Sequence, residues 1–195
     1  CFVCEANDNS IAIDAPRTCP VCPPNTPLNP KKGQPVLAHN AAHLLFDPAI
    51  RGTERCGMCL NPAPMCEYFM KKTGPPKIDI SRSKCPSLAV KFTYSIAAKS
   101  VSASPCSNVP VNCAVCGVED PAVWRYNYLH HLRHVHPVAP EEKYRSIWEL
   151  SAAETTAMKA IWETREKGVP IPQKRAPKTA PLVISEAHSS RLSMR

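Results

Sequence analysis

The chain has 195 residues and a formal net charge of +8, with 22 prolines, 11 cysteines and 7 histidines. Aromatic residues make up only 6% of it, and no long apolar run repeats at regular spacing, which argues against a single large hydrophobic core. No apolar stretch approaches the roughly 20 residues that a bilayer span requires, so we expect no membrane association. Bound metal is expected to replace the missing core as a source of folding free energy.

The pattern of cysteines argues against a secreted disulfide framework. Their number is odd, no signal peptide opens the chain, and several of them pair in spacing with histidines. A reducing compartment is therefore expected.

Residues 1–18 contain Cys1 and Cys4, which have the spacing of half a metal site. One interpretation pairs them with Cys19 and Cys22 in a four-cysteine ribbon. In a second, their partners lie upstream, so that the segment belongs to a preceding element of a longer chain. In a third, they are simply a free thiol pair.

Residues 19–46 carry a complete ligand set. Cys19-Pro-Val-Cys22 predicts a tight turn, and Gln34-Pro35 predicts the start of a helix that continues to Phe46. His39 and His43 lie one turn apart on that helix. The spacing Cys-x2-Cys-x16-His-x3-His favours a zinc site made of Cys19, Cys22, His39 and His43 over the ribbon.

Residues 47–112 form a cysteine-rich module with five cysteines for a four-ligand ion. Cys56-Gly-Met-Cys59 predicts a metal-binding turn, whereas the other three cysteines follow at long intervals. We expect a Cys4 zinc site in which Cys66 is left out as a small buried hydrophobe. The expected ligands are Cys56, Cys59, Cys85 and Cys106.

The same module contains a basic stretch and a candidate strand. Lys71, Lys72, Lys77, Arg82 and Lys84 decorate the loop between Cys66 and Cys85, as phosphate contacts or as a solvated surface. The alternation around Phe92 and Tyr94 predicts a short strand over 90–98.

Residues 113–137 repeat the plan of the first site with the spacing Cys-x2-Cys-x14-His-x4-His. Asp120 predicts an N-cap and Pro137 a helix end, with an apolar stripe between them. His131 lies on that stripe and His136 in a bent last turn, so His130 and His134 should point outward. The expected zinc ligands are Cys113, Cys116, His131 and His136.

The C-terminal part changes character. Residues 138–168 predict a helical hairpin, because Glu141–Leu150 is amphipathic and Ser151-Ala-Ala-Glu154 matches a capping box. Its tryptophans are expected to pack against the preceding finger. Residues 169–195 have the composition of a basic disordered tail, and Lys174-Arg175-Ala-Pro-Lys178 resembles a thin nuclear-targeting patch.

At residues 19–43 and 113–136 the chain resembles the Cys2His2 zinc-finger superfamily. As a whole it resembles lineage-specific fungal zinc-finger proteins of unassigned function. The resemblance implies zinc at these two sites, a nuclear location and nucleic-acid binding. With the Cys4 site expected in the cysteine-rich module, the chain should bind about three zinc ions. The expected fold is a set of small metal-stabilised modules, irregular, with short helices and little strand: two Cys2His2-like fingers flanking a cysteine-rich module, then the hairpin and the tail.

The resemblance also implies which side chains would face DNA. Three positions before and beside the first ligand histidine read bases in such fingers. In the first finger they fall on Lys32, Pro35 and Ala38, which cannot read sequence. In the last finger they fall on Trp124, Asn127 and His130. The expected nucleic-acid-binding residues are Arg125, Asn127, His130 and Arg133.

These features favour a zinc-binding regulatory protein that contacts nucleic acid, DNA rather than RNA. The alternative is a zinc-stabilised protein-interaction module without nucleic-acid contact. An enzyme with a small-molecule substrate is not expected, because the His-containing sites are filled by four protein ligands and catalytic zinc needs an open position. The deaminase, phosphate-loop and serine-nucleophile motifs are also missing from the sequence.

Overall fold

The structure is a computed structural model that describes residues 17–22 and 26–167. Cys1, Cys4, Gly168 at the end of the expected hairpin, and the tail with its basic patch lie outside the described residues. Within the described ranges, no helix has both the length and the apolar character needed to cross a membrane.

The N-terminal part is a small hairpin followed by a buried helix. Strands β1 (Arg17–Thr18) and β2 (Pro27–Leu28) pair antiparallel, and the turn with Cys19 and Cys22 lies between them. Helix α1 (Gly33–Phe46) confirms the expected helix and starts slightly before Pro35. Its side chains are buried without a break from Val36 to Leu44, so neighbours surround it on every face.

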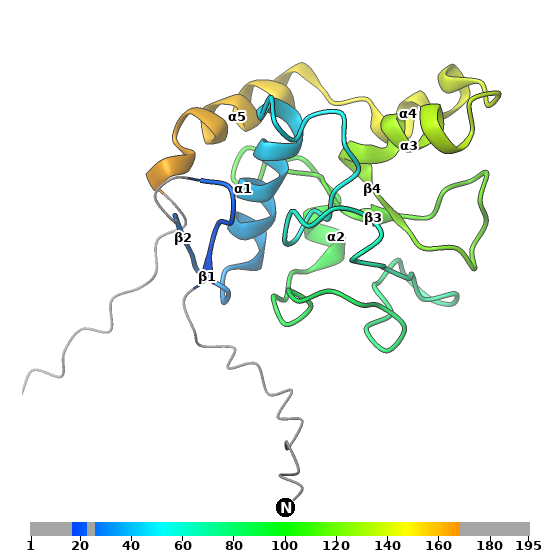
Figure 1. Ribbon diagram of the computed structural model, residues 1–195, viewed down its shortest axis with the longest axis horizontal. Coiled ribbons are helices and arrows are strands. Elements are labelled where there is room, and N and C mark those ends of the chain that lie inside the picture. The colour runs from blue at the N-terminus through cyan, green and yellow to red at the C-terminus, as the bar shows by residue number, and fades with distance from the viewer. Residues whose placement is uncertain (1–16, 23–25, 168–195) are drawn as a thin grey trace, which may run out of the picture.

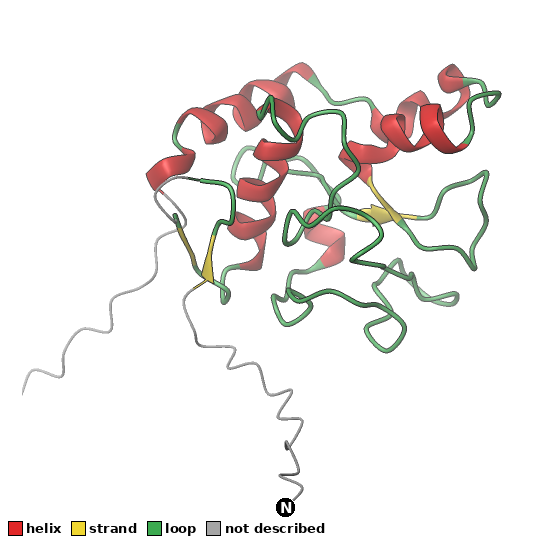
Figure 2. Ribbon diagram, viewed as in Figure 1, coloured by secondary structure: helices red, strands yellow, loops and turns green. Residues whose placement is uncertain are grey.

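The central part is mostly loop, as Figure 2 shows. The strand predicted over 90–98 is wrong: Tyr94–Ala97 forms the single-turn helix α2. The backbone N–H groups of Ala97 and Ala98 donate to the carbonyls of Thr93 and Tyr94. The segment pairs with no strand in the described part of the chain, so its alternating pattern is not used in a sheet.

The last predicted finger, residues 113–137, is called the third finger below because its ligand set is the third along the chain. It contains a strand where the start of a helix was predicted. Strand β4 (Val123–Trp124) pairs with β3 (Pro110–Val111), and a 3-10 turn, η1 (Arg125–Asn127), follows. Helix α3 then covers Tyr128–Val135. The backbone N–H of Arg125 donates to the carbonyl of Val109, so the β ladder occupies the groups that an earlier helix start would need.

The C-terminal segment does not form the expected hairpin. A 3-10 turn, η2 (Glu141–Tyr144), and helix α4 (Arg145–Trp148) pack against η1 and α3, with Trp148 beside the third finger as expected. Helix α5 (Ala152–Glu163) instead lies along α1, and the turn η3 (Arg165–Lys167) ends the described chain. Figure 1 shows α5 crossing above α1 while α4 lies beside α3.

The N-cap of α5 confirms half of the capping box. The Ser151 hydroxyl accepts from the backbone N–H of Glu154, at 3.1 Å. The Glu154 carboxylate does not turn back to the cap but is buried in a polar network, where it accepts from the backbone N–H of Ser107 and the hydroxyl of Tyr126. Helix α5 is therefore tied by a buried acid to the loop before β3.

The buried apolar residues form a core that the modules share. One cluster includes Leu37 of α1, Met58 and Tyr68 of the cysteine-rich part, Trp124 of β4 and Met158 of α5. The core is thus assembled from contributions too small and too scattered to be seen as one periodic run in the sequence. A second, smaller cluster joins α3 to α4.

Gly33 provides a test of this joint packing. A Cβ at this position would lie 2.1 Å from the carbonyl oxygen of Lys91, in the wall of the cysteine-rich part. Alanine normally stabilises a helix relative to glycine by up to about 1 kcal/mol. We expect the opposite sign here: Gly33→Ala should lower the free energy of unfolding of the zinc-loaded protein by about 1–3 kcal/mol, because the backbone contact must open. Chemical denaturation measures the change.

The control is Thr156→Ala, at an exposed position of α5. It should leave stability unchanged or raise it by a few tenths of a kcal/mol, roughly the helix-propensity difference. A stabilised Gly33→Ala protein would contradict the close contact between α1 and the segment around Lys91.

Candidate metal centres

The first centre lies between the hairpin and α1. Cys19 and Cys22 come from the turn after β1, and His39 and His43 from successive turns of α1. The Nε2 atom of His43 lies 3.5 Å from Sγ of Cys19 and 3.1 Å from Sγ of Cys22. The sulfur–nitrogen edge of a tetrahedral zinc site is about 3.5 Å, so the four donors fit one ion. All four residues are buried, as a closed structural site requires.

A second sphere orients His43. Its Nδ1 lies 2.9 Å from Oδ2 of Asp47, and the other oxygen of that carboxylate accepts from the backbone N–H of Ala49. Burial acts to raise the pKa of Asp47, but the hydrogen bonds from His43 and Ala49 outweigh it and the pKa is lowered. A charged Asp47 therefore fixes the tautomer that leaves Nε2 free for metal.

The first centre is covered by the C-terminal helix. The indole of Trp162 meets the His43 ring edge-on, with centroids 5.3 Å apart. The guanidinium of Arg165 lies over the outer face of that indole, 3.6 Å from its centroid. Trp162 was expected to pack against the third finger; it instead shields a ligand of the first.

The central centre is made of Cys56, Cys59, Cys66 and Cys85. The Sγ atoms of Cys59 and Cys66 are 3.4 Å apart, and that of Cys85 lies 3.8 Å from those of Cys56 and Cys59. The sulfur–sulfur edge of a tetrahedral zinc site is about 3.8 Å. Hydrogen bonds from the other three thiols lower the pKa of Cys56, whereas hydrogen bonding to Cys56 and burial raise the pKa of Cys59, Cys66 and Cys85.

This set corrects the predicted ligands, because Cys66 occupies the place assigned to Cys106. The loop from Cys59 turns back and brings Cys66 to the cluster. Cys106 is fully buried in the shared core, and burial raises the pKa of its thiol to about 12. Its sulfur lies outside the four-sulfur cluster and among apolar side chains, which makes it a core residue and not a ligand. Cys66 is therefore the ligand and Cys106 the buried core residue, the reverse of the prediction.

Backbone amides support the sulfurs of the central centre. The N–H of Met58 points to Sγ of Cys56 at 3.4 Å, and the N–H of Ser87 points to Sγ of Cys85 at 3.3 Å. Tyr68 is buried, with its hydroxyl 3.7 Å from the Cys56 sulfur. The two backbone donors share the negative charge that four thiolates would place on one divalent ion.

The third centre joins the turn after β3 to α3. Its residues are those predicted: Cys113, Cys116, His131 and His136. Sγ of Cys116 lies 3.3 Å from Nε2 of His131 and 2.9 Å from Nε2 of His136. The helix ends at Val135, and His136 follows in a non-helical conformation that brings it back to the site. The three clusters in the described part of the chain could each hold a zinc ion, three in all.

The predicted base-reading residues of the third finger make contacts within the protein, and two of them are buried. Trp124 is buried in the core. Asn127 is also buried, and its side-chain amide donates to the carbonyl of Arg55 at 2.6 Å. His130 stacks on His134, with ring centroids 3.8 Å apart. Trp124 and Asn127 could enter a groove only by breaking these contacts, whereas His130 is half-buried and its stacking partner His134 is exposed.

The two arginines expected at phosphate are also engaged. Arg125 donates to the carbonyls of Ile147 and Glu149, at 2.6 and 3.1 Å, and so ties the finger to α4. Arg133 forms a bidentate ion pair with Glu141, in which Nε and Nη2 lie 2.8 and 2.9 Å from the two carboxylate oxygens. In the first finger, Ala38 is buried in α1, in agreement with its expected inability to read bases.

No protein-family profile, curated protein or solved structure matches the chain. The identification of zinc-binding modules therefore depends on the ligand sets and their geometry.

Cysteine substitutions can separate the two assignments for the central centre. In Cys66→Ser the fourth thiolate is lost, so native mass spectrometry should show two zinc ions instead of three. In Cys106→Ser the count should stay at three, because the thiol lies outside the cluster. Loss of one ion from Cys106→Ser, with three retained in Cys66→Ser, would restore the predicted set.

The role of Asp47 can be tested at the first centre. The neutral amide of an asparagine would not offer a charged acceptor to both His43 and Ala49, so Asp47→Asn should weaken zinc binding at this centre about 10–100-fold. Competition with a chromophoric chelator measures the change. The matched control is Glu54→Gln at the third centre: its carboxylate lies 3.9 Å from Nδ1 of His131, beyond hydrogen-bond range, and the loss should be below about threefold. Equal losses would contradict a specific role for Asp47.

Proposed function

We propose that this chain is a zinc-organised protein-binding domain, and that its metal ions are structural. The observation that carries the proposal is the engagement of the third finger. Asn127 donates inward to the Arg55 carbonyl, and Arg125 donates to two carbonyls of the α4 region. The face that a DNA-reading finger would present is used here to attach neighbouring elements.

The composition of the centres supports a structural role for the ions. Each cluster has four Cys or His donors, which leaves no position for a water or a substrate. The central centre, with four thiolates and no imidazole, is the least suited to activate a water, because its charge is already over-compensated.

Nucleic-acid binding is the second candidate, and one observation favours it. Residues 71–99 carry seven lysines or arginines and a single acidic residue, Asp79. Such a segment attracts any polyanion through counterion release, without reading its sequence. The protein-binding proposal therefore predicts weak DNA affinity that depends on salt and not on sequence. A nuclear location stays a prediction.

In vitro selection from random duplex DNA tests the choice between the two. With the three-zinc protein we expect no consensus sequence to emerge, and a displayed peptide library to yield binders that release when zinc is chelated. Enrichment of a DNA sequence bound about a thousandfold more tightly than random duplex would contradict the proposal.

A charge-matched pair of variants makes the test sharper. Arg133→Gln and Lys84→Gln each remove one positive charge, the first from α3 and the second from the basic segment. If DNA binding is non-specific, each should lower the salt slope by about one and weaken binding of every sequence alike. A loss confined to Arg133→Gln would place DNA on the third finger.

A further inference from the structure

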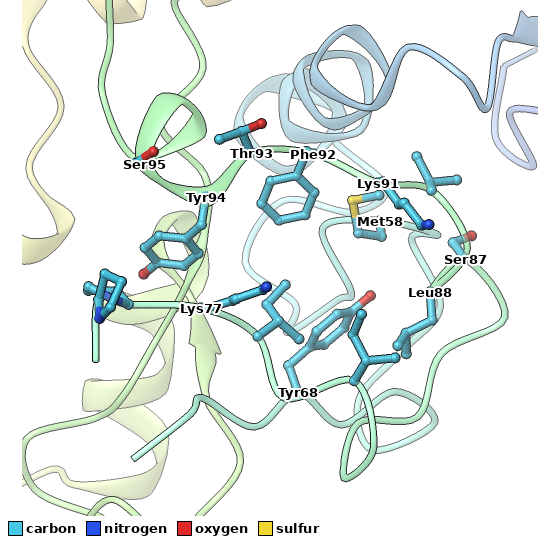
Figure 3. Close-up of a pocket in the computed structure, with 15 residues that line it drawn as sticks. Met58, Tyr68, Lys77, Ser87, Leu88, Lys91, Phe92, Thr93, Tyr94 and Ser95 are labelled. Carbon is cyan, nitrogen blue, oxygen red and sulfur yellow. The ribbon is translucent and has the colours of Figure 1, made fainter. Parts of the chain in front are cut away.

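The basic segment lines a cavity of about 570 Å³ beside the central centre. Its walls are aliphatic and aromatic, with Ile78, Leu88 and Val90 among the former and Tyr68, Phe92 and Tyr94 among the latter. Figure 3 shows these rings turned toward a common space. The volume lies within the range of sites that bind small ligands or single side chains.

The central centre builds this cavity. Met58 and Ser87 both line it, and their backbone N–H groups point to the sulfurs of Cys56 and Cys85. Tyr68 forms another part of the wall and directs its hydroxyl to the Cys56 sulfur. The loops that carry the ligands of the central centre therefore also form part of the wall.

Contacts with the rest of the protein fix the remaining walls. The hydroxyl of Tyr94 donates to the carbonyl of Pro110 at 2.8 Å, and the ring of Tyr68 packs edge-on against Trp124. Gly33 of α1 lies against the backbone of Lys91 and the Cβ of Phe92. A rigid apolar cavity loses little conformational entropy when it is filled.

Two lysines border the cavity, and neither has an ion-pair partner among the described residues. Lys77 and Lys91 are exposed, and they reach the cavity from opposite sides in the view of Figure 3. Their neighbours Lys72 and Arg82 are paired with Glu119. The cavity thus combines an apolar interior with two uncompensated positive charges at its edge.

We propose that this cavity binds a peptide segment of a partner protein that places a large apolar side chain between aspartates or glutamates. The apolar residue fills the space between Phe92, Tyr68 and Leu88, and its acidic neighbours meet Lys77 and Lys91. The inference rests on the proposed protein-binding function and names the chemistry of the partner.

The lining favours a peptide over a nucleotide. A base brings several donors and acceptors that need partners once they are desolvated. The interior offers mainly aliphatic and aromatic surface, and the hydroxyl of Tyr94 is already used by Pro110. A leucine or phenylalanine side chain makes no such demand. Lysines at the rim then provide selectivity for acidic flanks and a faster encounter.

A peptide selection followed by site-directed variants tests the proposal. The three-zinc protein is used to select from a random displayed library, and the peptides obtained are measured by fluorescence polarisation. We expect an apolar anchor flanked by Asp or Glu. Lys77→Glu and Lys91→Glu should each weaken binding about tenfold or more, because like charges then face each other. Ile80→Ser should also weaken it, because this residue lines the cavity and is 60% exposed.

The matched controls are Lys99→Glu and Lys159→Glu, two exposed lysines outside the cavity lining. Each should change the affinity less than about threefold, the share of long-range charge alone. All variants must retain three zinc ions by native mass spectrometry, so that a loss of binding is not a loss of fold.

The outcomes distinguish this inference from the function on which it rests. If selected peptides bind equally well to Lys77→Glu, Lys91→Glu and the controls, the cavity is not the site, although protein binding stands. If the library yields no binder, both proposals fail. A single-stranded oligonucleotide that displaces the peptides and binds more tightly would assign the cavity to nucleic acid and overturn the inference.

Discussion

The convergence of four donors on a point is the constraint on which this structure depends. In the central part it acts on loops whose regular pairing is limited to isolated antiparallel bridges, such as those of Glu67 with Lys84 and of Met70 with Ile78. A thiolate set closed by one ion fixes the relative positions of Cys56, Cys59, Cys66 and Cys85, and with them the segments between. The supporting amides of Met58 and Ser87 then follow from the direction of each turn.

Coordination does not act alone. Helix α1 carries two ligands on one side and is buried on its other sides by α5 and the shared core. The same helix is therefore a metal-binding element and the centre of the apolar packing. This double use explains how a chain with few aromatic residues can enclose a core: each element adds one or two side chains, and the metal centres bring these elements together.

The sequence predicts the parts of the fold that depend on local spacing. Each of these two centres combines two cysteines on a turn with two histidines close together in the sequence, on a helix or directly after it, so the first and third centres are predicted with the right ligands. The choice between Cys66 and Cys106 depends on the path of long loops, which spacing does not determine. Strand pairing also depends on the path of distant segments. The alternating pattern at 90–98 therefore predicts a strand, but no described segment lies where it could pair with it.

The features that the sequence did not predict share a physical cause. An apolar face shows that an element is covered, but it does not identify the element that packs on it. The apolar residues of α5 are compatible with a hairpin, but they pack on α1. Trp124 fits a helical stripe, yet it lies in a strand because β3 is available to pair with it. The inward orientation of Asn127 could not be predicted either, since the carbonyl of Arg55 that it contacts is distant in the sequence.

The position of Trp162 has a consequence for the order of events during synthesis. The four ligands of the first centre leave the ribosome before the indole that shields His43, which belongs to the last described α-helix. Until that helix has been made, the first ion is held by a loop and a helix with an open side. We therefore expect metal exchange at this centre to be faster on the nascent chain than on the finished one. The first centre is fully enclosed only when α5 has been made and has packed on α1.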